Sequence, residues 1–277
     1  MNIIANKYQI QKKLGEGNFG SVCKGVCLNT QKIVAIKLEH QSVEHSLMKH
    51  EATVLHYLDT QKCKYIPYLH YYGYQSPYKC IVMSYFSQGS LDLWLTYLQL
   101  EEKIDWWNTA LETIQYIHKA GIVHRDLKPQ HFIRDDNHVW HLIDFGLSTT
   151  YLDDNQEHII ESPNDSIVGS PAYVSWFVHQ GKDVTRRDDF LSLAYIFWEL
   201  LYGSFIGVSE NVTNNHSTDV IDEFNLWLRD QKGFDRFYTL LDAKNDNMVD
   251  FMVSILSHAE ELRFTDKPCY DLFKLEL

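Results

Sequence analysis

Long apolar runs and clusters of positive charge are both missing from this chain of 277 residues. Its most apolar stretch, residues 191–202, is too short to span a bilayer and contains Glu199. Residues 1–7 hold no apolar segment of signal-peptide length. The 37 acidic residues outnumber the 25 Lys and Arg, for a formal net charge of −12, whereas a nucleic-acid surface needs clustered cations. We therefore expect neither a membrane nor a nucleic acid as partner.

Cysteine is also sparse, with five scattered residues. Cys23 and Cys27 lie four apart, but no second Cys or His pair follows at zinc-finger spacing. His138 and His141 are the tightest histidine pair, and without a matching carboxylate cluster they are expected to flank a short strand. We therefore predict that the cysteines are reduced and that the protein is located in the cytoplasm or nucleus.

The apolar content is high enough for a large packed interior, with 45% hydrophobic and 14% aromatic residues. Neither an internal repeat nor a low-complexity tract occurs. Residues 8–40 and 80–85 have strand patterns, whereas residues 43–58, 91–100, 105–120 and 187–202 have helical ones. Gly121 and Gly203 end the last two helices, as glycine commonly does. The predicted fold class is α+β, with a small β-rich part preceding a larger helical one.

Gly15, Gly17, Gly20 and Val22 form a G-x-G-x-x-G-x-V pattern. Glycine lets a backbone bend sharply and approach phosphates closely, although glycine turns between strands are common. A dinucleotide-binding fold would need a helix directly afterwards. Residues 21–26 have a strand pattern instead, which favours a phosphate-covering hairpin.

Lys37 ends the strand segment V-A-I-K, in which such a lysine contacts nucleotide phosphates and pairs with a helix glutamate. Glu51, on the helix predicted at 43–58, is the partner available. Taken alone, Glu51 would be a solvated carboxylate. Its position relative to Lys37, with Leu55 facing the core one turn later, favours the pair.

Two further segments, H-R-D-L-K at 124–128 and D-F-G at 144–146, carry the chemistry. Asp126 can accept the proton of a serine or threonine hydroxyl, and Lys128 can offset charge on a phosphoryl group. Asp144 is a hard oxygen ligand suited to magnesium. The four segments, in this order and spacing, resemble a eukaryotic-type protein kinase, and D-L-K-P favours serine or threonine over tyrosine as acceptor.

His131 departs from this pattern, which has a metal-binding asparagine there. An imidazole nitrogen is softer than an amide oxygen and suits magnesium less well. Three consequences stay open: activity with one weakened metal site, substitution by Mn²⁺, or a nucleotide-binding pseudokinase acting as a scaffold or allosteric partner. The intact Lys37, Asp126 and Asp144 favour activity.

Within the kinases, the chain is most similar to the casein kinase 1 family. Three segments show this resemblance: residues 6–8, R-R-D-D-F-L-S-L at 186–193 and L-R-F-T-D-K-P-C-Y at 262–270. The resemblance implies ATP and Mg²⁺ as cofactors and Asp189 as a brace beneath the catalytic loop. It also implies a nucleotide site with a gatekeeper, a hinge and an adenine sandwich: Met83; Ser84, Tyr85 and Phe86; Val22, Ala35 and Ile133.

A single bilobal domain over 1–277 is expected, with an N-lobe at 1–83, a hinge at 84–87 and a C-lobe at 88–277. We expect a compact monomer without the family's C-terminal regulatory tail. The predicted function is ATP-dependent phosphorylation of protein serine or threonine.

The charge around the activation segment departs from the family. No Lys or Arg occurs from 135 to 181, and Ala172 stands where the family usually has arginine. The same stretch carries Asp153, Asp154, Glu157, Glu161 and Asp165. These acids could merely solvate a loop, and Lys182, Arg186 and Arg187 could supply an anion pocket. We nevertheless predict neutral or basic substrates rather than acidic ones.

Overall fold

The computed structural model describes residues 3–17, 20–163, 167–203, 233, 235, 240 and 248–276. Its contacts divide the chain into two compact units. Unit 1 comprises Met1–Leu91 and His131–Ser148, and unit 2 comprises Asp92–Gln130 and Thr149–Leu277. Segment 131–148 thus belongs with the amino-terminal residues. The lobe boundaries expected from the sequence stay a prediction.

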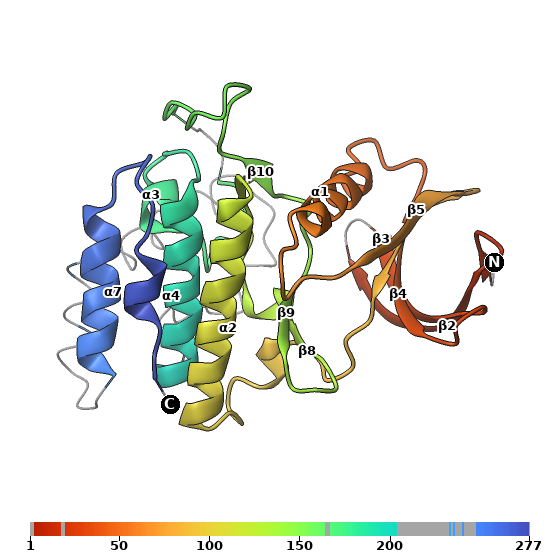
Figure 1. Cartoon of the computed structure of the whole chain (residues 1–277), viewed down its shortest axis with the longest axis horizontal. Coiled ribbons are helices and arrows are strands. Elements are labelled where there is room, and N and C mark those ends of the chain that lie inside the picture. The colour runs from red at the N-terminus through yellow and green to blue at the C-terminus, as the bar shows by residue number, and fades with distance from the viewer. Residues whose placement is uncertain are drawn as a thin grey trace, which may run out of the picture. The chain divides into compact units, whose positions relative to one another are not determined.

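Unit 1 is built on a six-stranded antiparallel sheet in the order β1-β2-β3-β4-β6-β5 (Figure 1). Its strands are β1 Ile3–Ile4, β2 Tyr8–Gly17, β3 Gly20–Cys27, β4 Ile33–His40, β5 Leu69–Gln75 and β6 Tyr78–Ser84. Alternation along β4 buries Val34, Ile36 and Leu38 in one core cluster. The opposite parity leaves Ala35 and Lys37 on the other face of the sheet.

Two further elements complete unit 1. Helix α1, Met48–Thr60, contacts β5 and β6 and buries Leu55 and Leu58. The hairpin of β8, Phe132–Arg134, and β9, Trp140–Leu142, joins the unit through backbone bonds. Leu142 N donates to Tyr65 O at 2.8 Å, and Arg134 N donates to Gly89 O at 3.0 Å. These bonds hold residues 131–148 against the chain that precedes Leu91.

Unit 2 is mainly helical. Its longest helices, α2 Leu100–Lys119, α4 Arg186–Tyr202 and α7 Val249–Glu261, lie side by side (Figure 1). Trp107 packs against Phe197 and Phe251 and donates from Nε1 to Phe273 O at 2.7 Å. Aromatic contacts therefore join all three helices.

The remaining elements of the described chain are short. They are the strands β7 Ile122–Val123 and β10 Thr149–Thr150, the helix α3 Trp176–His179, and the 3₁₀ turns η1 Leu91–Leu93, η2 Pro129–His131 and η3 Tyr270–Phe273. Strands β7 and β10 pair antiparallel at either end of the segment that returns to unit 1. No helix in the described ranges combines the length and hydropathy of a membrane-spanning segment.

Several predicted boundaries are wrong. The helix expected at 91–100 is only the turn η1, and α2 begins at Leu100 rather than 105. Glu102 supplies the start signal, because its Oε2 accepts from Gln99 N at 3.2 Å. Residues 43–47 are not helical and only 44 and 45 form a turn, so α1 begins at Met48. The predicted ends at Gly121 and Gly203 are confirmed, with φ of 83° and 81°.

Candidate active site

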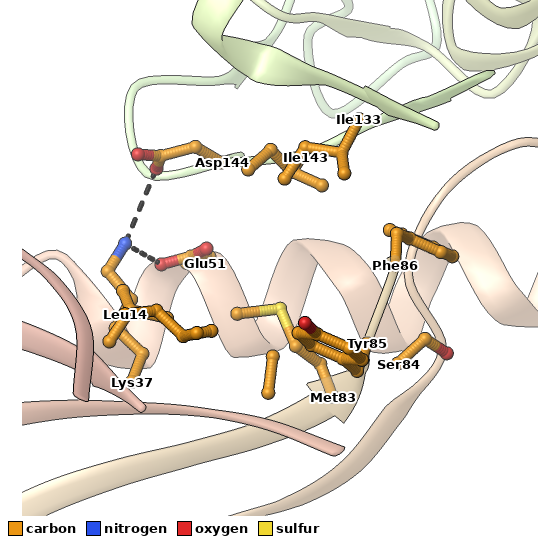
Figure 2. A pocket seen from close by; sticks show the side chains of 12 residues that line it. Leu14, Lys37, Glu51, Met83, Ser84, Tyr85, Phe86, Ile133, Ile143 and Asp144 are labelled. Carbon is orange, nitrogen blue, oxygen red and sulfur yellow. Dashed lines mark hydrogen bonds and ion pairs between the residues drawn. The ribbon is translucent and has the colours of Figure 1, made fainter. Parts of the chain in front are cut away.

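Lys37 and Glu51 form an ion pair inside unit 1. Strand β4 and helix α1 bring Lys37 Nζ within 2.7 Å of Glu51 Oε2 and 3.4 Å of Asp144 Oδ1 (Figure 2). The Glu51 side chain is only 1% exposed. Burial disfavours the Lys37 charge, but the attraction of Glu51 and Asp144 outweighs it and raises the pKa of Lys37. The Lys37 ammonium group therefore stays charged, and its two ion pairs fix its position.

A cavity opens beside this ion pair. Twelve residues line it: Leu14, Val22, Ala35, Lys37, Glu51, Met83, Ser84, Tyr85, Phe86, Ile133, Ile143 and Asp144. The charged side chains gather at one end, and Tyr85 and Phe86 lie toward the other (Figure 2). Such a cavity, mostly apolar with a few polar groups, is typical of a small-molecule site.

All the residues assigned to the gatekeeper, hinge and adenine sandwich line this cavity. The sequence reasoning missed Leu14 and Ile143. Each lies directly beside a motif residue, Leu14 before Gly15 and Ile143 before Asp144, so adjacency could have identified them.

The glycine-rich segment forms the hairpin between β2 and β3, in which Gly17 pairs with Gly20. Asn18 and Phe19 lie outside the described residues. Gly20 has φ of 140°, and a Cβ there would come within 2.0 Å of Leu38 O, so the backbone requires glycine. A Cβ on Gly15 would meet no atom within 4 Å, so packing does not require glycine there.

His131 and Asp144 lie side by side in unit 1. His131 is the last residue of the turn η2, and its carbonyl accepts from Ile143 N at 2.8 Å. Its Nε2 is 3.7 Å from Asp144 Oδ2, and the residue is 7% exposed. No set of three His, Cys, Asp or Glu side chains that could hold a metal occurs among the described residues.

These residues suit a divalent cation only in part. Mg²⁺ in nucleotide sites typically takes one or two protein carboxylates, with phosphates and waters completing its shell. Asp144 fits that role, because it lines the cavity beside Lys37. His131 offers a softer nitrogen donor at the position of the expected second ligand.

In unit 2, the catalytic-loop residues form a triangle with a serine. Asp126 Oδ2 accepts from Lys128 Nζ at 3.0 Å, and Asp126 Oδ1 accepts from Ser170 Oγ at 2.7 Å. Lys128 Nζ also donates to Ser170 Oγ at 3.1 Å. Ser170 was missed as a site residue because it is 44 positions from Asp126.

Asp189 holds the loop from the start of α4. Its carboxylate accepts from His124 N at 2.7 Å, Arg125 N at 2.9 Å and His118 Nε2 at 2.9 Å. Arg125 has a positive φ of 68°, so the loop turns sharply there. Burial opposes the charge on Asp189, but these bonds outweigh it and keep its pKa below the usual value. The expected bracing contact is present.

The acidic residues of the segment after β10 lie on the surface: Asp153, Asp154, Glu157 and Glu161 are exposed. Asp165 lies outside the described residues. Hydrogen bonds from the backbone N–H groups of Glu157 and Asn155 lower the pKa of Asp153.

Two of the cations that could form an anion pocket, Arg186 and Arg187, make contacts within the protein. Arg186 donates to Thr265 O and stacks over Tyr151. Arg187 is 2% exposed and donates to Leu262 O at 3.2 Å. An anion pocket built on these two guanidinium groups would have to displace these contacts.

Comparison with protein-family models gives a match that covers nearly the whole chain. Residues 8–273 match the model described as Protein kinase domain. The match includes both the cavity of unit 1 and the Asp126 triangle of unit 2.

Proposed function

The chain belongs to the protein kinase family, and we propose that it transfers the γ-phosphate of ATP to serine or threonine residues of protein substrates. The bilobal α+β kinase fold agrees with the β-rich sheet of unit 1 and the helices of unit 2. We further propose one domain over 1–277, with an N-lobe at 1–83, a hinge at 84–87 and a C-lobe at 88–277.

The triangle of Asp126, Lys128 and Ser170 carries this proposal. The Asp126 carboxylate already accepts a hydrogen bond from an aliphatic hydroxyl, the group that a serine or threonine substrate would present. In the proposed reaction, Asp126 orients the substrate hydroxyl and accepts its proton. Lys128 offsets charge on the transferred phosphoryl group. Ser170 keeps both side chains in place.

The cavity of unit 1 is proposed to hold ATP. Val22, Ala35 and Ile133 would enclose the adenine, and residues 84–86 would form the hinge beside it. Gly15, Gly17 and Gly20 would cover the phosphates. Lys37, held by Glu51, would contact the α- and β-phosphates.

Asp144 would hold a divalent cation, for which we propose Mg²⁺, with Mn²⁺ as an alternative. When bound, this cation neutralises charge on the phosphates. His131 would be a weak second ligand, because its nitrogen suits Mn²⁺ better than Mg²⁺.

His131 also favours a second candidate function, that of a nucleotide-binding pseudokinase. It is nearly buried and its Nε2 lies 3.7 Å from Oδ2 of Asp144, the proposed metal ligand. In that case the cavity would bind nucleotide while phosphate transfer is lost, and the chain would act as a scaffold or allosteric partner.

A casein-kinase-1-like subfamily is proposed from segments 186–193 and 262–270. The two segments contact each other, since Arg187 donates to Leu262 O and Arg186 donates to Thr265 O. Arg263 adds an ion pair with Asp266 at 3.1 Å. The two segments are thus hydrogen-bonded to each other in unit 2, which supports treating them as one feature of the proposed subfamily.

We also propose neutral or basic protein substrates, because four exposed acids occupy the segment after β10 and no Lys or Arg occurs from 135 to 181. The cytoplasmic or nuclear location and the monomeric state stay predictions.

The test is transfer of radiolabelled γ-phosphate to a generic protein substrate, with Mg²⁺ and then with Mn²⁺. Asp126→Asn should lower the rate at least about 100-fold, because it removes the proton acceptor. Glu101→Gln, which removes one exposed charge from the same unit outside the segment after β10, is the matched control and should keep the wild-type rate. Equal background from wild type and Asp126→Asn under both metals would refute phosphate transfer and leave the pseudokinase.

A further inference from the structure

His141, outside the predicted site, stacks on the hinge residue Phe86. The two ring centroids are 3.9 Å apart and the ring planes meet at 8°. Phe86 lines the cavity of unit 1, whereas His141 does not. One face of the Phe86 ring is therefore covered by His141. Such aromatic pairs stabilise a protein by more than the burial of their surface area alone would.

The orientation of His141 is set by Asp135, which directly follows β8 in the same hairpin. His141 Nε2 lies 3.1 Å from Asp135 Oδ2. Asp135 is itself held, since its Oδ1 accepts from Asn137 N at 2.8 Å and Val139 N at 2.9 Å. A carboxylate fixed by two backbone groups leaves the imidazole ring little freedom to rotate.

The hydrogen-bonding pattern selects one form of the His141 ring. Its Nδ1 is buried and has no hydrogen-bond partner among the described residues. A proton there would lack an acceptor, so the neutral ring with its proton on Nε2, facing Asp135, is favoured. Burial acts in the same direction and lowers the pKa of His141. A neutral ring can stack face to face on Phe86 without bringing a buried charge.

The same hairpin is also hydrogen-bonded to the residues that follow Phe86. Gln88 N donates to Arg134 O at 3.0 Å, Arg134 N donates to Gly89 O at 3.0 Å, and Asp136 accepts from Ser87 Oγ. These bonds fix the backbone after the hinge, and none of them touches the Phe86 ring. Among the described residues, the stack on His141 is the contact that orients the Phe86 ring itself.

We propose that His141 is a positioning residue for nucleotide binding, which acts by holding the Phe86 ring flat against the end of the cavity. The Asp135 carboxylate supports it by fixing the imidazole. This inference rests on the proposed binding of ATP in that cavity and not on phosphate transfer. It predicts an effect on nucleotide affinity rather than on turnover, because Lys37 and Asp144 lie toward the opposite end of the cavity (Figure 2).

Two substitutions separate the stacked ring from the hydrogen bond. His141→Phe keeps an aromatic ring but cannot bond to Asp135. His141→Gln keeps a donor for Asp135 but has no ring. Exposed His138, on the same hairpin, supplies the matched control His138→Asn, since asparagine tolerates its positive φ of 65°.

The measurement is equilibrium binding of ATP with Mg²⁺ by calorimetry on the full chain, with thermal unfolding of each variant as the check on folding. His141→Gln should weaken binding roughly two- to tenfold, the range expected for one lost aromatic pair. His138→Asn should bind like the wild type, and His141→Phe should lose less affinity than His141→Gln, because it keeps the ring but not the bond to Asp135. Where transfer is measurable, His141→Gln should raise KM for ATP and leave kcat unchanged.

The proposal is overturned if His141→Gln binds ATP like the wild type, or if His141→Phe loses as much affinity as His141→Gln. A fall in kcat without a rise in KM would also overturn it. Wild-type protein that binds ATP but transfers no phosphate would refute the proposed kinase activity while leaving this test intact.

Discussion

Replacing His131 by asparagine tests how the metal site of this kinase is built. The substitution restores a hard amide oxygen beside Asp144, where the chain has an imidazole nitrogen. Mg²⁺ holds its ligands at about 2.1 Å in octahedral geometry, which places neighbouring ligand atoms about 3.0 Å apart. His131 Nε2 is 3.7 Å from Asp144 Oδ2, so in this arrangement the two atoms are too far apart to be ideal neighbouring ligands.

The expected effect is a gain in activity that depends on the metal. Changes next to a bound metal typically alter affinity or activity 10- to 100-fold. Because Asp144 remains, we expect the lower end, roughly a tenfold rise in the rate of phosphate transfer with Mg²⁺. The gain with Mn²⁺ should be smaller, because Mn²⁺ accepts imidazole well. The backbone bond from Ile143 N to His131 O does not depend on the side chain and should persist.

The assay is phosphate transfer at saturating ATP over a range of each metal, with His138→Asn as the control histidine substitution. Thermal unfolding checks that the nearly buried site tolerates asparagine. Lower activity with both metals would refute the reasoning. It would mean that His131 has a role of its own, such as a bond to Asp144 or to a phosphate.

Three further predictions follow from other contacts. Glu51→Gln should lower the pKa of Lys37 and reduce the rate of phosphate transfer more than tenfold, as kinetics would show. Because the substitution leaves a buried polar group poorly paired, urea unfolding should also show a free energy of unfolding that is lower by about 1–3 kcal/mol. Asp189 has a lowered pKa in the folded protein, so its contribution is present above about pH 4 and lost as the pH falls through that lowered pKa. Asp189→Asn should therefore reduce the loss of stability that urea unfolding shows as the pH falls below about 4. Peptides with neutral or basic residues should be phosphorylated faster than acidic or phosphoserine-primed ones, with added salt narrowing the difference; an array that favours acidic upstream positions would contradict this.

The parts of this chain that could be predicted from sequence are those with short-range signals. Lys37 lies within the strand β4 and Glu51 on the next helix, so pattern and spacing were enough to pair them. Gly121 and Gly203 were identified as helix ends because a positive φ favours glycine.

The missed features depend on contacts between distant residues. Ser170 meets Asp126 across 44 positions, and nothing near Ser170 in the sequence indicates that contact. His141 was read only as one end of a histidine pair, since its stack on Phe86 depends on how the β8–β9 hairpin folds back onto the hinge. The start of α2 was placed too late because one carboxylate, that of Glu102, defines it.

The Ser170 hydroxyl has a consequence for control of the proposed reaction. It is the link between the chain segment around Pro171 and the carboxylate of Asp126. While that link holds, both oxygens of Asp126 are engaged, and the side chain is fixed before any substrate arrives. A partner protein that binds the segment and draws Ser170 away would remove the hydrogen bond to Asp126 Oδ1 and so loosen the hold on the carboxylate. Such a partner would slow turnover without touching the nucleotide, and its inhibition would not be relieved by raising the concentration of ATP.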